Sequence, residues 1–341
     1  MTIEELAKSE GIWSSEERCD ADIVLKSSVS FRRNIKGYLF AHKLGKKERE
    51  NLNSLIISKI EGVENCKGWP VYDLEKCTAI DKKIFFERNI IEDNVFNHGV
   101  LIVSRDQNCY FILNNRDHVR LVTNGYGFHF ESIYHLGKKI IAEVEKNLGF
   151  EWNKEFGYLT ANPLNCGTGT AFSMTLHLAG LVGSGKINEL LFDLEKRGLF
   201  LRSSWVDGYY EISNKKSAGI IEKELYNSIK DNFKSIVSRE RAERENVYRL
   251  NKSLIEDKVW RSYGLLLSCR LLSLFEALDL LSHLRLGISL GIIGCIGIKE
   301  INLLLYYVQD YHLRKRYGVK DISSELDGLR AQFIREYLKS I

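Results

Sequence analysis

The stretch VLIVSRDQNCYFILNNRDHVRLVT, residues 100–123, predicts the sheet on which the rest of the chain is built. Two apolar runs, Val100–Val103 and Cys109–Leu113, flank the polar turn at residues 106–108, which is typical of a β-hairpin. A third strand, His118–Thr123, follows four polar residues. The stretch therefore favours an antiparallel meander.

A second informative stretch is FGYLTANPLNCGTGTAFS, residues 156–173. Apolar residues precede and follow a loop that contains Pro163 and the turn Gly167-Thr168-Gly169. Loops held by rigid elements are common places for binding sites. A structural turn is the alternative, because short Gly-X-Gly patterns are frequent. Cys166, in the same loop, is either a nucleophile or an inert buried thiol.

Periodicity predicts the elements around these strands. Apolar residues recur at helical spacing in segments 46–61, 132–148, 187–196 and 221–237, and Tyr209–Ser213 is expected to be a strand.

The composition changes after residue 237. Segment 238–252 is dense in both charges and is interpreted as a solvated helix that bridges two parts. Helices are then expected at Val259–Leu272, Leu274–Leu284, Gly297–Tyr307 and Glu325–Leu338. Their interior is expected to contain Leu266, Leu267, Leu271, Leu278, Leu281 and Leu303. We therefore expect an α+β fold, in which residues 1–237 form an antiparallel sheet flanked by helices and residues 238–341 form an all-helical domain.

The overall composition is that of an ordinary globular protein. With 341 residues, 44% hydrophobic and 28% charged, the chain is long enough for two domains. The net charge of +4 comes from interspersed residues, which argues against a nucleic-acid surface. Seven scattered cysteines without a Cys-X-X-Cys pair favour reduced thiols in a cytoplasm over disulfides or a zinc site.

Targeting and membrane segments are not expected. The first residues are acidic where a signal peptide would be basic. The apolar segment Leu286–Ile298 is short and interrupted by glycine, so we interpret it as a buried helix.

Common catalytic motifs are missing from the sequence. It has no Gly-Lys-Ser or Gly-Lys-Thr phosphate loop, dinucleotide fingerprint, His-Glu-X-X-His or Gly-X-Ser-X-Gly. Lone histidines such as His177 and His283 are interpreted as structural residues.

Five segments nevertheless occur together in a characteristic order. They are Asp117–Arg120, Asn162–Gly169, Glu211–Asn214, Trp260–Gly264 and His283–Ile288. With Arg33-Asn34, they resemble the ATP:guanidino phosphotransferases, most closely the bacterial protein-arginine kinases of the McsB type. The resemblance runs from about residue 23 to the C-terminus. It implies the guanidino-kinase catalytic fold, followed by a helical domain of the phosphoarginine-binding and dimerisation type.

The resemblance implies a particular chemistry. Several arginines bind the ATP phosphates, because a guanidinium group matches phosphate oxygens in a bidentate manner. Two glutamates hold and deprotonate the substrate guanidinium, so catalysis comes from alignment and charge neutralisation. The matching active-site loop comprises Asn162, Asn165, Cys166, Gly167, Thr168 and Gly169.

Several of the expected nucleotide-binding arginines are replaced in this chain. A pair of them falls on Ser28 and Ser30, and the loop arginine falls on Ala171. Arg120 is retained, and Arg197 matches a further phosphate arginine. Each lost arginine removes charge-assisted bonds worth about 1.5 to 3 kcal/mol.

The expected catalytic acids are replaced as well. The first glutamate falls on Arg116, and no acid stands at the expected position of the second, before Asp207. The substrate-side cysteine falls on Asn162. Charge reversal at about 4 Å changes the interaction with a guanidinium by several kcal/mol, so such a substrate should be repelled. Asp207 and Glu211 are the carboxylates that could substitute.

The family's phosphoarginine-binding motif, Arg-Asp-X-X-Arg-Ala, is incomplete. Its first arginine falls on Leu326, whereas Asp327, Arg330 and Ala331 match. Phosphoarginine binding by Asp327 and Arg330 and a simple amphipathic helix are both compatible with this segment.

The resemblance therefore implies a catalytically degenerate homologue, a pseudokinase that serves as a binding or adaptor module in Clp-type protein quality control. The alternative is an active protein-arginine kinase with a rearranged site, which would use ATP and Mg²⁺. The implied partners are a Clp-type unfoldase, a zinc-binding kinase activator or an active kinase paralogue, with phosphoarginine as a ligand. We expect a cytoplasmic homodimer that has no metal site of its own and binds neither nucleic acid nor membranes.

Overall fold

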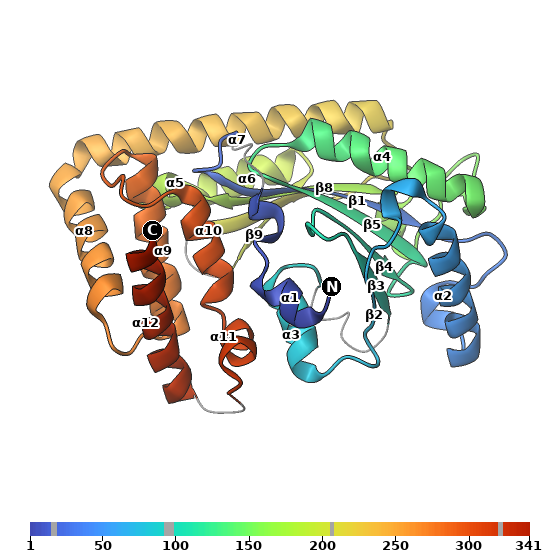
Figure 1. Cartoon of the computed structure of the whole chain (residues 1–341). Coiled ribbons are helices and arrows are strands. Elements are labelled where there is room, and N and C mark those ends of the chain that lie inside the picture. The colour runs from blue at the N-terminus through green and yellow to red at the C-terminus, as the bar shows by residue number, and fades with distance from the viewer. Residues whose placement is uncertain (15–18, 92–98, 205–207, 320–322) are drawn as a thin grey trace.

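The computed structural model describes residues 1–14, 19–91, 99–204, 208–319 and 323–341 (Figure 1). Its centre is an eight-stranded antiparallel sheet with the strand order β2-β3-β4-β5-β1-β8-β10-β9. The strands are β1 (Val24–Arg33), β2 (Val71–Asp73), β3 (Val100–Val103), β4 (Cys109–Leu113), β5 (Val119–Tyr126), β8 (Thr170–His177), β9 (Leu199–Ser203) and β10 (Tyr209–Asn214). A short hairpin of β6 (Trp152–Asn153) and β7 (Gly157–Tyr158) stands apart. The predicted antiparallel sheet and its meander are confirmed.

Strand β1 lies between β5 and β8 and sets the chemistry of both sheet faces. Side chains alternate along a strand, so Val29 and Phe31 point into the core whereas Ser30 and Arg32 point to the opposite face. In the antiparallel register Arg32 lies opposite Arg120 of β5. The register thus gathers polar side chains of several strands on one face.

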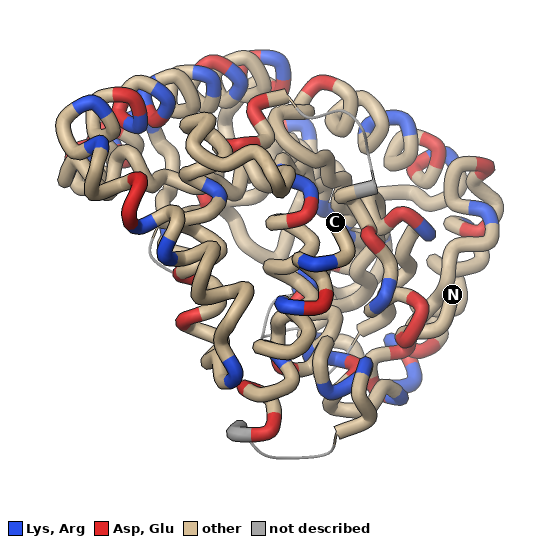
Figure 2. The backbone as a smooth tube through the Cα atoms, turned by 60° about the vertical axis from the view of Figure 1, so that its left-hand side comes forward, with Lys and Arg blue, Asp and Glu red and all other residues tan. Residues whose placement is uncertain are grey.

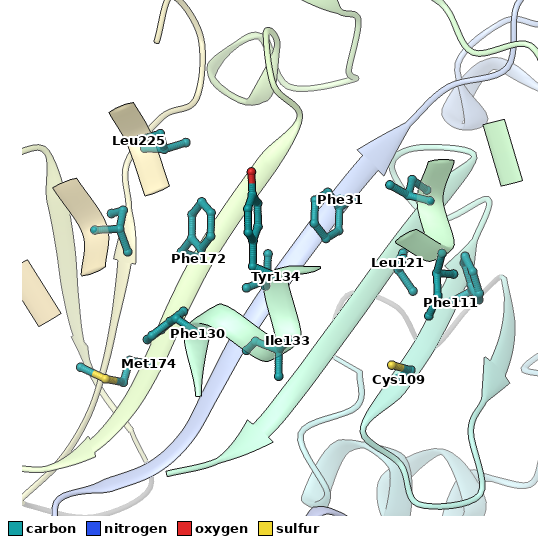
Figure 3. Close-up of a cluster of buried hydrophobic side chains, with 14 of the residues drawn as sticks. Phe31, Cys109, Phe111, Leu121, Phe130, Ile133, Tyr134, Phe172, Met174 and Leu225 are labelled. Carbon is teal, nitrogen blue, oxygen red and sulfur yellow. The ribbon is translucent and has the colours of Figure 1, made fainter. Parts of the chain in front are cut away.

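Helices pack on both faces of the sheet: most lie on the face of Val29 and Phe31, whereas those at Ile3–Lys8 and Ala79–Glu87 cover the opposite face over β3, β4 and β5 (Figure 1). The helices that precede residue 252 are α1 (Ile3–Lys8), α2 (Lys46–Glu61), α3 (Ala79–Glu87), α4 (Phe130–Asn147), α5 (Ala179–Gly183), α6 (Ile187–Lys196) and α7 (Glu222–Leu250). Figure 3 shows the core beneath α4 and α7, where Phe130 packs against Phe233 at 4.9 Å and Tyr134 against Phe172 at 5.8 Å between ring centroids. Burial of these large aromatic side chains stabilises the sheet–helix packing.

Helix α7 is a single element of 29 residues, where two helical segments were predicted. Residue 237, the predicted domain limit, lies inside it, and the division of the chain there stays a prediction. The expectation of a solvated charged segment was wrong for Glu240 and Arg244, which are 0% and 2% exposed. The close approach of α5 explains this burial, because a Cβ atom at Gly180 would lie 2.5 Å from the amide nitrogen of Arg244.

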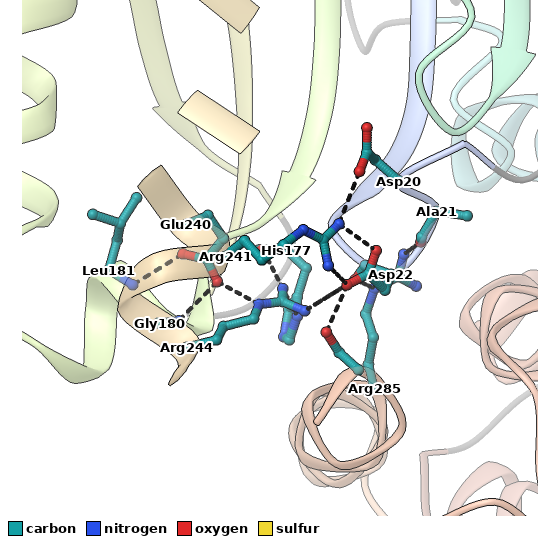
Figure 4. Close-up of polar contacts among 11 residues, drawn as sticks. Asp20, Ala21, Asp22, His177, Gly180, Leu181, Glu240, Arg241, Arg244 and Arg285 are labelled. Atoms are coloured by element: carbon teal, nitrogen blue, oxygen red, sulfur yellow. Dashed lines mark hydrogen bonds and ion pairs between the residues drawn. The ribbon is translucent and has the colours of Figure 1, made fainter. Parts of the chain in front are cut away.

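Glu240 and Arg244 form an ion pair within α7, and each side chain also bonds residues outside this helix, in α5 and at the end of β8 (Figure 4). Arg244 Nε donates to Glu240 at 2.6 Å, and the amides of Gly180 and Leu181 donate to the same carboxylate at 2.8 and 3.0 Å. Arg244 also donates to Nδ1 of His177, which places the ring proton on Nε2. Burial raises the pKa of Glu240 and lowers the pKa of His177 well below its ordinary range. His177 is therefore a neutral structural histidine.

Asp22, just before β1, extends this network to the C-terminal helices. Arg241 and Ser289 donate to its carboxylate at 3.0 and 2.6 Å, and Arg285 Nε donates to its backbone carbonyl at 3.0 Å. Burial favours a higher pKa for Asp22, but the hydrogen bonds from Arg241 and Ser289 and the charge of Arg244 hold its pKa below the ordinary value. The network thus connects β1, α7 and α9.

The remaining helices form a second apolar core. They are α8 (Lys252–Ser268), α9 (Leu274–Ser289), α10 (Ile298–Tyr307), α11 (Asp310–Tyr317) and α12 (Ser323–Ser340). Of the predicted interior residues, Leu266, Leu278, Leu281 and Leu303 are buried, whereas Leu271 is 69% exposed. The helix expected at residues 286–298 was wrong, because α9 ends at Ser289 and Gly291 adopts a φ of 70°. A left-handed residue at this position does not fit a continuous helix.

Lys and Arg are interspersed with Asp and Glu along the backbone (Figure 2). Among the described residues, no helix is both long and apolar enough to cross a bilayer.

Two glycines in motifs of the C-terminal helices allow a matched test of the α8–α9 packing. A Cβ atom at Gly287 would lie 2.4 Å from Cγ1 of Val259, whereas a Cβ atom at Gly264 would meet nothing within 4 Å. We expect Gly287→Ala to lower the free energy of unfolding by about 1–3 kcal/mol through overpacking. Gly264→Ala should raise it by up to about 1 kcal/mol through helix propensity. Urea denaturation followed by circular dichroism measures both, and equal shifts would contradict the packing.

Candidate functional site

A cleft of about 250 Å³ lies on the polar face of the sheet, and we call it the sheet cleft. It is bounded by β1, β4, β5, β8, β9 and β10, by residues 89–91 after α3, and by Asn165 of the glycine-marked loop. Alternate residues of β1 form its floor, because every second side chain of the strand faces the same side. These floor residues are Lys26, Ser28, Ser30 and Arg32.

The positions at which the resemblance placed missing arginines all line this cleft. Ser30 lies opposite Ala171 of β8, and Ser28 opposite Ser173. Ser28 donates from its hydroxyl to Asn124 Oδ1 at 2.6 Å, a bond that stays within the sheet. Small side chains therefore occupy the floor where three guanidinium groups were expected.

The sheet cleft is still basic. Arg120, which was predicted from the sequence, lines it together with Lys26, Arg32 and Arg202, which were not. Lys26 and Arg32 lie an even number of residues apart on one strand, and this spacing could have placed both side chains on the same face of the sheet. Burial lowers the pKa of Lys26, and the charges of Arg120 and Arg202 lower it further against the opposing effect of Glu211.

Glu211, one of the two substitute carboxylates, faces the sheet cleft. Its Oε2 atom accepts a hydrogen bond from Arg202 Nη2 at 2.7 Å, across the β9–β10 pair. The guanidinium of Arg202 therefore occupies one oxygen of this carboxylate. Asp207, the other candidate, lies outside the described residues.

A smaller hollow of about 60 Å³ adjoins the cleft and shares three of its residues, Arg32, Arg120 and Asn165. We call it the turn hollow, because its remaining lining comes from the β4–β5 turn and the active-site loop. These remaining residues are Asn115, Arg116, Asp117 and Asn162. Arg116, at the expected glutamate position, is exposed at its edge.

Asp117 holds the scaffold around the turn hollow. Its Oδ1 atom accepts hydrogen bonds from Asn34 Nδ2 and from the amide of Ala161, both at 2.7 Å. Asn34 in turn accepts from the amide of His118 at 3.0 Å. Asp117 therefore joins β1, the β4–β5 turn and the active-site loop.

His118 has a structural position as well. Its Nδ1 atom accepts from the amide of Ile35 at 2.9 Å, so its Nε2 proton is donated to the carbonyl of Leu39 at 2.8 Å. Burial lowers the pKa of His118, in agreement with a neutral ring. The retained Asp-His motif thus fixes backbone positions.

The active-site loop is held by Arg33. Its Nη1 atom donates to the carbonyls of Arg32 and Thr168 at 2.8 and 3.0 Å, and its guanidinium lies 3.5 Å from the ring centroid of Tyr158. Burial lowers the pKa of Arg33. Gly169, with a φ of 60°, lets the loop approach, because a Cβ atom there would lie 2.6 Å from the carbonyl oxygen of Arg32. The Gly-Thr-Gly turn is therefore structural in part.

Three further loop residues also have local partners. Gly167 has a φ of 88°, and its backbone pairs with Tyr158. Asn162 accepts the amide of Leu164 at 3.1 Å through its side chain. The half-buried Cys166 places its Sγ atom 3.5 Å from the hydroxyl of Thr160. Cys166 therefore contacts a hydroxyl group rather than an acid–base partner.

Arg197 does not join the other candidates. It is the C-terminal cap of α6, is exposed, and donates to Asn232 of α7 at 3.0 Å. It is not part of the lining of the sheet cleft or the turn hollow.

Comparisons with known proteins agree with this geometry. The family model for the ATP:guanido phosphotransferase C-terminal catalytic domain matches residues 46–243, and that for the protein-arginine kinase McsB C-terminal domain matches residues 252–341. A protein-arginine kinase of Clostridium acetobutylicum is 30% identical over 342 residues, which cover 96% of this chain and 99% of that protein. One of Clostridium kluyveri is 31% identical over 329 residues, covering 93% and 94%.

The chain belongs to the protein-arginine kinases of the ATP:guanido phosphotransferase family. Solved structures share its fold at lower identity. The duplicated taurocyamine kinase from Schistosoma mansoni has a TM-score of 0.59 at 21% identity, over 68% of this chain and 35% of that one. Lombricine kinase has a TM-score of 0.57 at 20% identity, over 71% of both chains. The predicted family and the guanidino-kinase fold are thereby confirmed.

The segment that resembles the family's phosphoarginine motif lies on α12. Arg330 is 1% exposed and donates to the carbonyls of Val308 and Leu272 at 2.8 and 2.7 Å. It also pairs with Asp327 at 2.6 Å and with Asp310. These contacts join α12 to the segments before α9 and α11. Phosphoarginine binding by Asp327 and Arg330 stays a prediction, and it would require Arg330 to exchange internal partners.

Arg33 and Arg197 were both assigned to family motifs, but Arg33 is buried and Arg197 is exposed. Replacing each by alanine therefore tests whether the contacts of Arg33 stabilise the loop. We expect Arg33→Ala to lower the free energy of unfolding by about 1.5–3 kcal/mol, because two carbonyls lose a charged donor. Hydrogen exchange at the amides of the active-site loop should accelerate. The exposed control, Arg197→Ala, should change stability by less than about 0.5 kcal/mol. Similar losses in both variants would contradict the anchoring role of Arg33.

Proposed function

We propose that this chain is a catalytically degenerate protein-arginine kinase, a pseudokinase that acts as a binding or adaptor module in Clp-type protein quality control. The observation that carries the proposal is Arg116, a cation at the turn hollow where the family resemblance expects a glutamate. A guanidinium substrate would meet a like charge there, and reversal of one charge at about 4 Å changes the interaction by several kcal/mol.

The positions at which the family resemblance expects ATP-binding arginines support the same proposal. Three of the expected phosphate-binding positions are Ser28, Ser30 and Ala171, and all three line the sheet cleft. The residues present do not fit ATP with Mg²⁺ as the family chemistry would require, and we assign no catalytic step to them.

The scaffold around the site is intact, and this favours a binding role over a loss of all function. Asn34, Asp117 and His118 still bond one another, and Arg33 still anchors the loop. We place the module in the cytoplasm as a homodimer. Its proposed protein partner is a Clp-type unfoldase, a zinc-binding kinase activator or an active kinase paralogue.

The alternative is an active kinase with a rearranged site. The position of Glu211 in the sheet cleft favours it, because a carboxylate there could bind a guanidinium. The 2.7 Å bond from Arg202 opposes it, since this carboxylate already has a cationic partner. Binding of an arginine substrate would have to displace Arg202.

Phosphoryl transfer provides the direct test. The purified full chain is incubated with labelled ATP, Mg²⁺ and an arginine-rich protein, with an active protein-arginine kinase as the positive control. We expect no acid-labile, arginine-linked label. Stable phosphoarginine formation that disappears in Arg120→Ala would contradict the proposal and support the alternative.

Introducing arginine at the three positions where the family resemblance expects it tests ATP binding separately from phosphoryl transfer. We expect Ser28→Arg, Ser30→Arg and Ala171→Arg together to strengthen ATP binding at least tenfold in calorimetry, since each charge-assisted bond contributes about 1.5–3 kcal/mol before compensation. The triple replacement by Gln at the same positions controls for side-chain length without charge. An equal gain in the Gln variant would mean that charge loss is not what limits ATP binding.

A further inference from the structure

A cavity of about 400 Å³ lies among helices α5, α7, α8 and α9, and we call it the helix cavity (Figure 1). Its apolar walls include Val182 of α5, Val247 of α7, Val259 of α8 and Leu286 of α9. Of the described residues, none lines both this cavity and the sheet cleft or the turn hollow. Its volume is typical of small-molecule sites, which measure about 300–1,000 Å³. The helix cavity is therefore a separate candidate site.

Three ionisable side chains belong to the described lining of this mainly apolar cavity. They are Lys258 of α8 and Asp279 and His283 of α9. Asp279 Oδ2 lies 3.9 Å from Nδ1 of His283, one helical turn away. Burial lowers the pKa of His283, the negative charge of Asp279 raises it, and the positive charge of Lys258 lowers it again. Both charges are therefore close to the same imidazole ring.

The hydrogen bonds of Ser262 fix the position of the proton on His283. The Ser262 hydroxyl donates its single proton to the backbone carbonyl of Lys258 at 2.7 Å. Its oxygen, which lies 3.2 Å from Nδ1 of His283, must then accept a proton from that nitrogen. The lowered pKa of His283 agrees with a neutral ring. The Nε2 atom consequently carries a lone pair and can accept a hydrogen bond from a ligand.

The two charged groups of the cavity are open to a ligand. Across the described ranges, the Lys258 ammonium group has no hydrogen bond or ion pair, and the Asp279 carboxylate has only the ring of His283 beside it. Lys258 is exposed, and the side chains of Asp279 and His283 are 50% and 30% exposed. A ligand can therefore reach all three from solvent.

We propose that the helix cavity binds a free α-amino acid with an apolar side chain, such as leucine. The ligand carboxylate pairs with Lys258, and the ligand ammonium group donates to Asp279 and to Nε2 of His283. The ligand side chain packs on the apolar walls, which include Val182 and Val247. The site is separate from the sheet cleft, so the proposal goes beyond the proposed function and does not depend on it.

Ligands with a single charge fit the cavity less well. An apolar carboxylate would leave Nε2 of His283 without a donor, and its charge would lie near that of Asp279. An apolar amine would leave Lys258 unpaired and would place a second cation near it. An α-amino acid carries an ammonium group, a carboxylate and an apolar side chain on one carbon atom. It therefore satisfies the anion, the cation, the ring nitrogen and the apolar walls together.

The experiment is isothermal titration calorimetry of the full chain with L-leucine and three matched analogues. N-acetyl-L-leucine lacks the ammonium group, L-leucinamide lacks the carboxylate, and glycine lacks the apolar side chain. We expect leucine to bind at least tenfold more tightly than each analogue, because each analogue loses one of the three contacts. Leucine should also raise the melting temperature, since it binds only the folded chain.

Neutral substitutions of the two charged residues locate the ligand. Lys258→Gln should weaken leucine binding at least tenfold and abolish the preference for leucine over leucinamide. Asp279→Asn should weaken it to a similar extent and abolish the preference over N-acetyl-leucine. The matched controls are Arg261→Gln and Asp257→Asn, a charged pair on α8 whose side chains are 75% and 59% exposed and which does not line the cavity. They should leave all affinities unchanged, and thermal melting shows whether any variant disturbs the fold.

Several results would overturn the inference. Equal affinity for leucine and leucinamide would mean that the cavity takes an amine, and equal affinity for leucine and N-acetyl-leucine would mean that it takes a carboxylate. Undiminished leucine binding in Lys258→Gln and Asp279→Asn, or displacement of leucine by ATP, would place the ligand elsewhere. Absence of leucine binding at millimolar concentration would overturn it outright. Phosphoarginine formation by the unmodified chain would contradict the proposed function alone.

Discussion

The buried ion pair between Glu240 and Arg244 is the constraint on which the arrangement of the chain depends (Figure 4). Both side chains are almost wholly buried, and removing one partner from such a pair costs about 3–5 kcal/mol, because an uncompensated charge is left inside. Arg244 also bonds His177, at the end of β8, and Asp22 links the same helix to Arg285 of α9. The sheet therefore cannot move relative to the C-terminal helices without breaking charged hydrogen bonds.

The alternation of β1 separates the stability of the fold from the chemistry of the site. Val29 and Phe31 pack into the core, whereas Ser28, Ser30 and Arg32 face the cleft. Substitutions on the cleft side change charge and hydrogen bonding but remove no apolar burial from the opposite face. Residues on the cleft face can therefore differ between members of the family while the fold is kept.

The sequence allowed prediction of the features that depend on local pattern. The hairpin of β3 and β4 has apolar runs around a polar turn, and α2 has a clear helical period, so both were found with nearly correct limits. The burial of Glu240 could not be predicted, because a mixed-charge helix has the same pattern whether its partners are water or the amides of α5. Alternation along β1 could have placed Lys26 on the same face as Arg32, but the position of Arg202 beside them depends on strand pairing across the sheet, which no local pattern encodes.

The retained and the replaced residues of the site differ in what they do when no ligand is bound. Asn34, Asp117 and His118 bond one another and fix the backbone, so their loss would destabilise the protein with or without a substrate. Clustered phosphate-binding arginines have the opposite effect, because like charges repel until an anion arrives. Under the proposed function, small residues such as Ser28 at these positions remove this repulsion. Arg116 does not follow this logic. It is an exposed cation that lines the turn hollow, and water screens its charge, so its presence costs the fold little.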